Sequence, residues 1–308
     1  MYYFLYALLY VFSLLPFFIL YIISDFFYFL IYRVFKYRRK VVFNNLEIAF
    51  PEKTLEEKKL IGKNFYRNLI DNFIESIKLL SISDKEFRRR AIMDFTEINA
   101  LVAKGKNIQL HGGHQMNWEY GHWAVAMQMP VPWLGVYMRI NSEAVDRLFY
   151  KIRSKGSTVL VAVQEFRSRV HKSFKQQYAM GLIADQNPGQ PASGYWLNFF
   201  NRPVPFATGP DKGARKNNTA VVFIKFVKLR RGYYRYESQV ITENAAEMSA
   251  GALTLMYRDF LERAIRENPD NYLWSHRRWK WDYKEEFKKR WIDVTPAPVI
   301  FDKSDSSK

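Results

Sequence analysis

The chain contains no cysteine. This absence excludes a thiol nucleophile, a disulfide framework and a zinc site built from thiolates. Acidic residues are also scarce relative to basic ones, with 30 Asp and Glu against 47 Lys and Arg, a formal net charge of +17. An excess of this size indicates a polyanionic neighbour, which can be nucleic acid, an anionic membrane surface, or a negatively charged substrate or carrier.

Charged side chains are almost absent from the first 32 residues. Between Tyr2 and Tyr32 the only one is Asp25, and most other positions are large apolar or aromatic residues. About 20 apolar residues suffice to cross a bilayer, and the segment has neither the basic start nor the small-residue cleavage site of a signal peptide. We therefore expect residues 1–32 to form an uncleaved transmembrane anchor. The alternative is a buried pair of helices in a soluble protein.

Basic residues follow the apolar run directly, at Arg33, Lys36, Arg38, Arg39 and Lys40. The positive-inside rule then predicts a single N-terminal span with the rest of the chain in the cytoplasm. Residues 33–100 are expected to be a membrane-proximal helical segment. It includes a helix over 54–80, which begins with the capping-box pair Thr54 and Glu57, and a second helix over 86–98.

Short apolar runs alternate with helical stretches from residue 101 onward. Strands are predicted over 107–111, 132–137, 158–163, 180–184, 219–229 and 233–241. Helices are predicted over 118–128, 142–154, 165–178 and 247–268. This alternation is typical of βαβ units, so we expect residues 101–294 to form an α/β domain with a mainly parallel central sheet flanked by helices. Residues 295–308 contain proline, serine and lysine and are predicted to be a disordered tail.

Residues 107–123 contain three of the five histidines and a glycine pair. The glycines allow the chain to leave the strand in a sharp turn, which presents His114 and Glu119 near the start of the following helix. A histidine oriented by a carboxylate is the usual arrangement of a general base. His111 and His122 lack this spacing to a carboxylate and are interpreted as structural.

Polar residues also follow two other predicted strands. Arg139 comes after the strand at 132–137, and Asp185 and Gln186 come after the strand at 180–184. In open α/β sheets, ligands bind beyond the carboxyl ends of the strands. We therefore expect these residues to meet His114 at one edge of the sheet. Asp185 can equally serve only to cap the turn that follows it.

Five blocks of sequence occur in an order that matches a known family. The first is Tyr37-Arg38-Arg39-Lys40-Val41-Val42, continued by Asn45-Leu46 and Ala49-Phe50-Pro51, and the second is the H-x4-E motif in His114-Gln115-Met116-Asn117-Trp118-Glu119. The others are Val136-Tyr137 with Arg139 and Asp146-Arg147-Leu148, then Gly181-Leu182-Ile183-Ala184-Asp185-Gln186, and finally Trp274-Ser275-His276-Arg277-Arg278-Trp279-Lys280. Over residues 5–283 the chain resembles the bacterial lipid A late acyltransferases, the HtrB-like lauroyl/myristoyl branch of the lysophospholipid acyltransferase superfamily.

This resemblance implies a bacterial inner-membrane enzyme, facing the cytoplasm, that moves an acyl chain from acyl carrier protein to a lipid hydroxyl and needs no cofactor or metal. A lipid A precursor is the expected acceptor, with a glycolipid, a lysophospholipid or an aminolipid as alternatives. Coenzyme A is the alternative donor. The chain departs from the family pattern at Met138-Arg139, where an Arg-Pro pair is expected after the tyrosine.

Acyl transfer to an alcohol requires a base, because a free hydroxyl is barely nucleophilic at neutral pH. A histidine with an ordinary pKa of about 6.5 can take that proton. We therefore predict that His114 deprotonates the acceptor hydroxyl while Glu119 orients the imidazole. The backbone around Gly113 and the side chain of Arg139 are candidates for stabilising the oxyanion. The other residues predicted to contact substrate are Gln115, Asn117, Asp185 and Gln186, with Asn117 alternatively holding the turn.

Two functions from other classes compete with this interpretation. A metal-dependent hydrolase would use His111, His114, Glu119 and His122 as ligands, although their spacing is a poor match to known zinc sites. A membrane-anchored nucleic-acid binder would explain the positive charge, but no recognition motif supports it. The acyltransferase therefore remains the leading hypothesis.

Overall fold

A seven-stranded sheet forms the centre of the molecule in this computed structural model, which describes residues 1–156, 158–166 and 176–299. The strands lie in the order β1–β9–β8–β2–β5–β3–β4. Their bounds are β1 Ala91–Met93, β2 Ile108–Gly112, β3 Trp133–Tyr137, β4 Thr158–Ala162, β5 Ala179–Ile183, β8 Ala220–Arg230 and β9 Tyr233–Thr242. Every neighbouring pair is parallel except β8 and β9. The predicted mainly parallel sheet is therefore confirmed.

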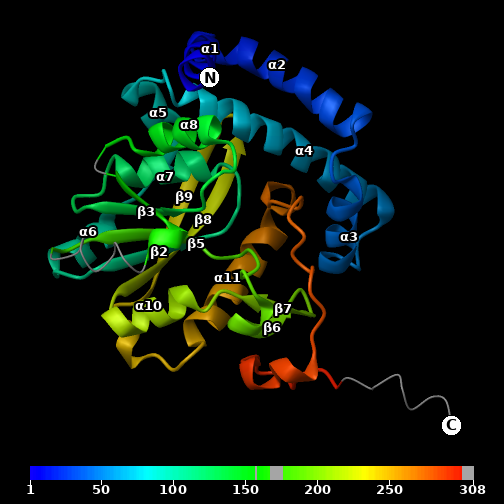
Figure 1. Ribbon diagram of the computed structural model, residues 1–308, viewed down its shortest axis with the longest axis vertical. Helices are drawn as coiled ribbons and strands as arrows, with labels where there is room; N and C mark the ends of the chain where they lie inside the picture. The colour runs from blue at the N-terminus through cyan, green and yellow to red at the C-terminus, as the bar shows by residue number, and fades with distance from the viewer. Residues whose placement is uncertain (157, 167–175, 300–308) are drawn as a thin grey trace.

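Helices cover both faces of this sheet (Figure 1). Those that flank it are α7 (Trp118–Ala126), α8 (Glu143–Arg153), α10 (Gly209–Asn217) and α11 (Ala252–Glu267). Residues of β8 point alternately to the two sides, as a strand requires: Val221 and Phe223 pack in the core that includes α11, and Val222 and Ile224 in the core that includes α7. The two apolar cores lie on opposite faces of one sheet, and this explains the nearly continuous apolar sequence of the central strands.

The long helix predicted over 54–80 is α4 (Leu55–Lys78), and its capping box is present. The Thr54 side chain accepts a hydrogen bond from the Glu57 backbone, and the Glu57 carboxylate accepts one from the Thr54 backbone at 2.7 Å. The turn between β8 and β9 is also as predicted, with Gly232 at a φ of 76°. Both outcomes follow from local backbone chemistry that a short stretch of sequence determines.

The prediction of a helix over 86–98 is wrong. The structure has a short helix α5 (Asp84–Arg90), then strand β1, then α6 (Thr96–Ala103). Strand β1 pairs in parallel with β9, from Ala91 opposite Tyr234 to Met93 opposite Tyr236. Pairing with a distant strand overrides the local helical pattern, which is why the sequence alone does not reveal it. The predicted helix over 165–178 lies largely on residues 167–175, outside the described residues.

A second, two-stranded sheet was not predicted. Strands β6 (Tyr195–Phe199) and β7 (Arg202–Phe206) form an antiparallel hairpin. Its aromatic residues stack on the C-terminal segment, where the Trp196 and Phe287 rings lie 4.8 Å apart. The remaining helical elements are α3 (Arg39–Ala49), the 3-10 turns η2 (Val163–Glu165), η3 (Pro191–Ser193), η4 (Ala245–Glu247) and η5 (Pro269–Asn271), and η6 (Glu285–Arg290).

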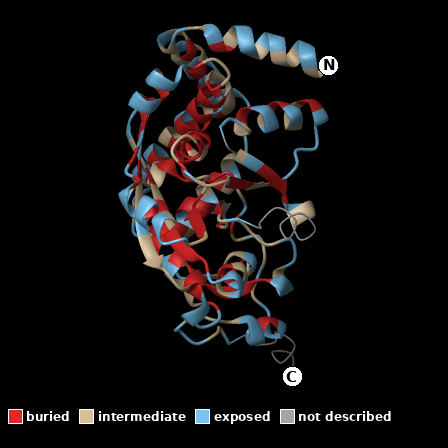
Figure 2. Cartoon of the chain, turned by 90° about the vertical axis from the view of Figure 1, so that its left-hand side faces the viewer, coloured by how far each residue is buried: buried red, intermediate tan, exposed pale blue. Residues whose placement is uncertain are grey.

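The apolar N-terminal run forms two helices, α1 (Tyr2–Leu14) and α2 (Phe17–Phe29), where one was predicted. The chain breaks at Pro16, because proline has no backbone N–H to continue the first helix. A π-helical turn, η1 (Leu30–Val34), extends α2, and the combined helix from Phe17 to Val34 is long and apolar enough to cross a membrane by length and composition. Figure 2 shows that α1, which carries the N-terminus, is exposed or half-buried along nearly its whole length.

Candidate active site

The turn between β2 and α7 presents His114. Strand β2 is buried throughout, and α7 begins at Trp118 with Asn117 as its N-cap. The Asn117 side-chain oxygen accepts hydrogen bonds from the backbone N–H groups of Glu119 and Tyr120, each 3.0 Å long. Its amide donates to the buried carboxylate of Glu75 at 2.8 Å. Asn117 is therefore fully buried and holds the turn, which was one of its two predicted roles.

The carboxylate that binds the His114 imidazole belongs to Asp185. The His114 Nδ1 atom lies 2.5 Å from Asp185 Oδ1, and the His114 backbone N–H donates to Asp185 Oδ2 at 2.9 Å. Asp185 follows β5, which pairs with β2, so the carboxyl ends of these two neighbouring strands bring the residues together. The convergence of His114 and Asp185 at one edge of the sheet is as predicted. Asp185 was predicted to contact substrate or to cap a turn, whereas both of its carboxylate oxygens bind His114.

This contact determines which ring nitrogen of His114 donates to Asp185. The Asp185 side chain is fully buried, and burial by itself disfavours its charge; the adjacent His114 and its hydrogen bonds outweigh that effect and hold the pKa of Asp185 below its ordinary value. An ionised carboxylate only accepts hydrogen bonds, so Nδ1 carries the proton of this contact, and in the neutral imidazole Nε2 then holds the lone pair. The His114 side chain is 21% exposed, and its ring packs edge-on against Trp118. Nε2 is therefore available as a base.

Glu119 has a different partner, which corrects the prediction that it orients the imidazole. Its carboxylate accepts hydrogen bonds from the Arg153 guanidinium, with Nε 2.9 Å from Oε2, and from the Trp118 indole at 3.1 Å. Burial opposes its charge, but Arg153 outweighs burial and lowers the pKa of Glu119. The structure shows no hydrogen bond between Glu119 and His114 among its described residues. Both side chains line the same cavity, but the Glu119 carboxylate binds Arg153 at the end of α8.

The remaining predicted site residues divide between the core, the surface and a cavity. Gln115 is fully buried in a β-bridge with Tyr272, and a side chain at Gly113 would meet Leu261 at 2.6 Å, so both positions serve the packing of the turn. The Arg139 side chain is 55% exposed and pairs with Glu165. Gln186 lines the cavity beside His114. Of these four, Gln186 is the one whose side chain is placed to contact a ligand.

A cavity of about 680 Å³ opens beside His114 and Glu119. Most of its lining is apolar and comes from α7 and the strands, including Trp118, Val125, Trp133, Leu160, Met180 and Phe226. A volume of this size is in the usual range for small-molecule sites, and such sites are mainly apolar with a few polar groups that orient the ligand. The cavity therefore combines the His114 imidazole with mainly apolar walls suited to a hydrocarbon chain.

His111 and His122 are structural, as interpreted from the sequence. His111 is buried in β2, with Nε2 3.0 Å from the Gln109 side-chain amide. His122 Nε2 donates to the Arg153 carbonyl at 2.9 Å. The histidines thus face separate partners, and within the described ranges no group of three or more His, Asp or Glu could hold a metal ion. The ligand set required by the rival metal hydrolase does not converge.

The buried His111 predicts a pH dependence of stability. Burial lowers its pKa to about 4 from an ordinary value of 6.5, so between these values the unfolded chain binds a proton that the folded chain does not. The free energy of unfolding should therefore fall as the pH drops from about 6.5 to 4, by an amount on the order of 3 kcal/mol. Denaturant titrations at several pH values would measure this fall in the free energy of unfolding, which should be smaller in His111→Phe than in the parent protein. The same pH dependence in both proteins would contradict the assignment.

Two residues of the site were missed by sequence reasoning. Arg153, the partner of Glu119, lies in the last turn of α8, and Glu75 supports Asn117 from α4. Glu75 is fully buried and accepts hydrogen bonds from Asn117, Tyr21 and Tyr234. Neither residue has a distinctive local sequence. The sequence offers one signal: if the Glu119 carboxylate is buried, it needs a basic partner from elsewhere in the chain.

Comparison with known proteins identifies the family of the chain. A family model described as bacterial lipid A biosynthesis acyltransferase matches residues 1–281. A lipid A biosynthesis palmitoleoyltransferase of Escherichia coli (strain K12) is 22% identical over 248 residues, which cover 80% of this chain and 79% of that protein. A lipid A biosynthesis lauroyltransferase of the same organism is 25% identical over 255 residues, which cover 80% and 81%. Because the family match extends over nearly the whole chain, the protein belongs to the bacterial lipid A biosynthesis acyltransferases and is an acyltransferase.

Proposed function

We propose that this protein transfers a fatty acyl chain from an acyl thioester to a hydroxyl of a lipid A precursor. The observation that carries the proposal is the His114–Asp185 pair beside a largely apolar cavity that His114 lines. A base beside an apolar cavity suits the attack of an alcohol on a thioester, because the cavity can hold the acyl chain while the base binds the hydroxyl. The names of the relatives, a palmitoleoyltransferase and a lauroyltransferase of lipid A biosynthesis, support the class of acceptor.

In the proposed reaction, His114 Nε2 removes the proton from the acceptor hydroxyl as its oxygen attacks the thioester carbonyl. Asp185, hydrogen-bonded to Nδ1, stabilises the imidazolium that forms. The tetrahedral intermediate then collapses: the carbon–sulfur bond breaks, and the leaving thiolate receives the proton from His114. No acyl-enzyme is required, because the chain supplies the base and the acceptor supplies the nucleophile.

The oxyanion of the intermediate requires fixed hydrogen-bond donors in a site that excludes water. Backbone N–H groups around Gly113 are our first candidates. Arg153 is a second candidate, since it lines the cavity and is 20% exposed while its charge is held by Glu119. Arg139 is a weaker candidate than the sequence indicated, because its guanidinium is largely exposed and already paired with Glu165.

The apolar part of the cavity is proposed to hold the acyl chain, and this gives a prediction about chain length. Leu160 is 4% exposed and lines the cavity, so Leu160→Trp should fill part of it. We expect the rate ratio of a long to a short acyl donor to fall by roughly 10-fold or more, because each methylene that loses its pocket weakens transition-state binding. Initial rates with donors of different chain lengths would measure this ratio.

The neighbouring residue provides the matched control for this prediction. Val159 is on the same strand, is 43% exposed and points to the opposite face. Val159→Trp adds the same side chain outside the cavity and should leave the donor preference unchanged. If Leu160→Trp and Val159→Trp shift the preference equally, the cavity is not the acyl-chain site.

The donor is proposed to be acyl carrier protein, with coenzyme A as the alternative. The catalytic domain is proposed to lie on the cytoplasmic side of the bacterial inner membrane. A formal charge of +17 suits both an acidic carrier and anionic lipid. The N-terminal apolar helices supply the anchor. Competition between the two thioesters in a transfer assay identifies the donor.

Mass spectrometry of membrane lipids tests the acceptor. Cells that lack the gene should lose one acyl chain from lipid A, and the wild-type gene should restore it while His114→Ala should not. Loss of an acyl chain from another glycolipid, a lysophospholipid or an aminolipid, with lipid A unchanged, would replace the proposed acceptor. An unchanged lipid profile in every class would contradict the proposed function.

A further inference from the structure

Helix α2 lies along α4 and shows one face to the protein and one to the surroundings. Its buried residues are Leu20, Ser24 and Tyr28, four positions apart, and they lie on the side of the helix that packs along α4. The opposite face carries Phe18, Ile22, Phe26 and Phe29, which are 65%, 64%, 59% and 53% exposed. The helix therefore has an unpartnered apolar face, and its other face is occupied along its length.

Both ends of α2 are attached to the same domain. At its start, the Lys78 ammonium donates to the carbonyls of Ser13 and Leu15 at 2.7 and 3.0 Å. Beyond its end, the Tyr32 ring in η1 lies 5.3 Å from the ring of Tyr66. Lys78 and Tyr66 belong to α4, so α4 accompanies α2 from one end to the other. A helix that crosses a bilayer alone would have its two ends on different sides of the membrane.

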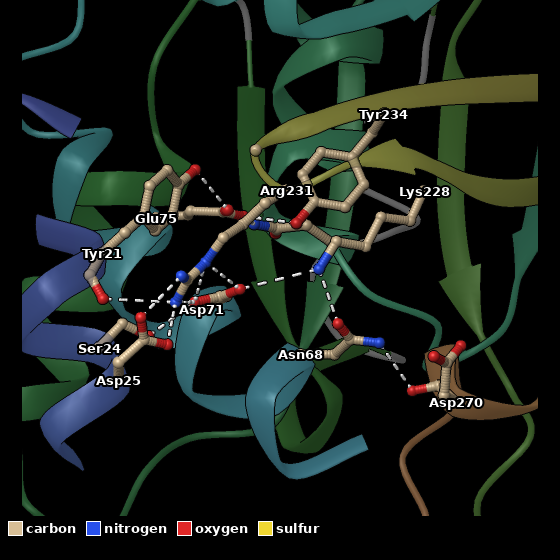
Figure 3. A network of polar contacts seen from close by, with 12 residues as sticks. Tyr21, Ser24, Asp25, Asn68, Asp71, Glu75, Lys228, Arg231, Tyr234 and Asp270 are labelled. Atoms are coloured by element: carbon tan, nitrogen blue, oxygen red, sulfur yellow. Dashed lines mark hydrogen bonds and ion pairs between the residues drawn. The ribbon is translucent and has the colours of Figure 1, made fainter. Parts of the chain in front are cut away.

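Charged groups of the domain meet the middle of α2 (Figure 3). Asp25 accepts hydrogen bonds from Arg231 at 2.9 and 3.0 Å, and Arg231 also pairs with Asp71 of α4. Ser24 donates to Asp71 at 2.6 Å, and Tyr21 donates to the buried Glu75. If α2 crossed the membrane, these ions would lie near the bilayer centre, where charged side chains are costly and rare.

Helix α1 is attached in the same way. The Arg147 and Lys151 side chains of α8 lie over the rings of Tyr2 and Tyr6, at 4.3 and 4.2 Å from the ring centres. The outward residues of α1 are apolar and exposed: Tyr3, Phe4, Leu8, Val11 and Leu14. In both views of the molecule, α1 and α2 lie along the same end (Figures 1 and 2).

We propose that α1 and α2 lie flat in one leaflet as a monotopic membrane anchor and do not form the single span expected from sequence length. Their exposed apolar faces would enter the boundary between head groups and acyl chains, as interfacial helices do. The basic segment that follows, with Arg33, Lys36, Arg38 and Lys40 exposed, provides the charge that anionic head groups attract. The inference takes the bilayer as the partner from the proposed function but does not depend on the acyl acceptor.

The absence of cysteine makes the test direct, because each introduced thiol is unique. Spin labels attached to Phe18→Cys, Ile22→Cys, Phe26→Cys and Phe29→Cys would report depth in vesicles of phosphatidylethanolamine and phosphatidylglycerol. Along a helix perpendicular to the bilayer, positions 18 and 29 differ in depth by about 16 Å. In the proposed geometry all four labels have nearly the same shallow depth. Lys216→Cys, exposed on α10, is the control and should show no contact with lipid.

Labelling in cells provides the second measurement. A membrane-impermeant maleimide added to intact spheroplasts should leave Tyr3→Cys and Lys216→Cys unmodified, and both should react once the membrane is disrupted by detergent. The proposal would be overturned if Tyr3→Cys alone reacted in intact spheroplasts. It would also be overturned if the spin labels gave depths that run through both leaflets, or if the labelled protein failed to bind vesicles. A failed acyl-transfer assay with uniform shallow depths would count against the proposed function and leave this inference standing.

Discussion

Replacing His114 with alanine should lower the rate of acyl transfer by roughly 10²–10⁴-fold, the usual contribution of a general base. We propose His114 as the base because Asp185 occupies Nδ1, which leaves Nε2 free of that contact, and because the residue lines the cavity. The purified variant should be assayed with an acyl thioester and a lipid acceptor, and its thermal unfolding should match that of the parent protein. A His114→Ala variant with near-normal turnover would show that this imidazole is not the base.

A companion variant tests whether Asp185 is the carboxylate that supports His114. Asp185→Asn keeps the shape of the side chain but removes the charge that stabilises the imidazolium, so it should also lower the rate strongly. Its amide can donate to Nδ1, which would favour the tautomer with the proton on Nε2 and block that atom as a base. The rate deficit should therefore exceed what a lost salt bridge alone would cause. An active Asp185→Asn enzyme would be incompatible with the proposed pair.

Removing one member of the Glu119–Arg153 pair should destabilise the protein by about 3–5 kcal/mol, because the remaining charge is left buried without its partner. Glu119 is 3% exposed and Arg153 is 20% exposed, so water can compensate little of the loss at Glu119. Chemical denaturation of Glu119→Gln and of Arg153→Met should each show this decrease in the free energy of unfolding. Losses below about 1 kcal/mol, typical of exposed pairs, would contradict it.

The double variant separates stability from chemistry at this pair. Glu119→Leu combined with Arg153→Met replaces the ions by apolar groups of similar size and should recover most of the stability. If the pair only supports α7 and α8, transfer activity should recover with stability. If Arg153 stabilises the oxyanion, the double variant should be stable and still slow. The two readouts together therefore decide what the H-x4-E glutamate does in this chain.

Helix α2 and the turn that carries His114 are connected through one buried side chain, Glu75. Glu75 accepts hydrogen bonds from Tyr21 on α2 and from Asn117, which caps α7. Because Asn117 caps α7 directly after the turn with His114, we expect the packing of α2 on α4 to influence the position of the proposed base. A monotopic α2 would thus lie close to both the lipid surface and the support of the active site.

Much of the fold was predictable because it depends on local patterns. Apolar runs of strand length alternate with amphipathic helices from residue 107 to the end of α11, and this alternation leads to a parallel sheet with helices on its faces. The capping box at Thr54 and the glycine turn at Gly232 are recognisable within a few residues. Strand β1 and the β6–β7 hairpin were missed, because their pairing partners and packing surfaces come from distant parts of the chain.

By itself, the sequence predicted the family and the mainly parallel sheet, and it made His114 the candidate base. Ordered motifs, alternating apolar runs and a histidine after a glycine pair can all be read from residue types along the chain. Which carboxylate meets the imidazole was decided only by the tertiary structure. Glu119 is five residues away and Asp185 is 71, yet adjacent parallel strands bring the distant residue to Nδ1 while the near one turns toward Arg153. The same holds for the N-terminal helices: their composition indicates a membrane, and their packing along α4 decides how they can meet it.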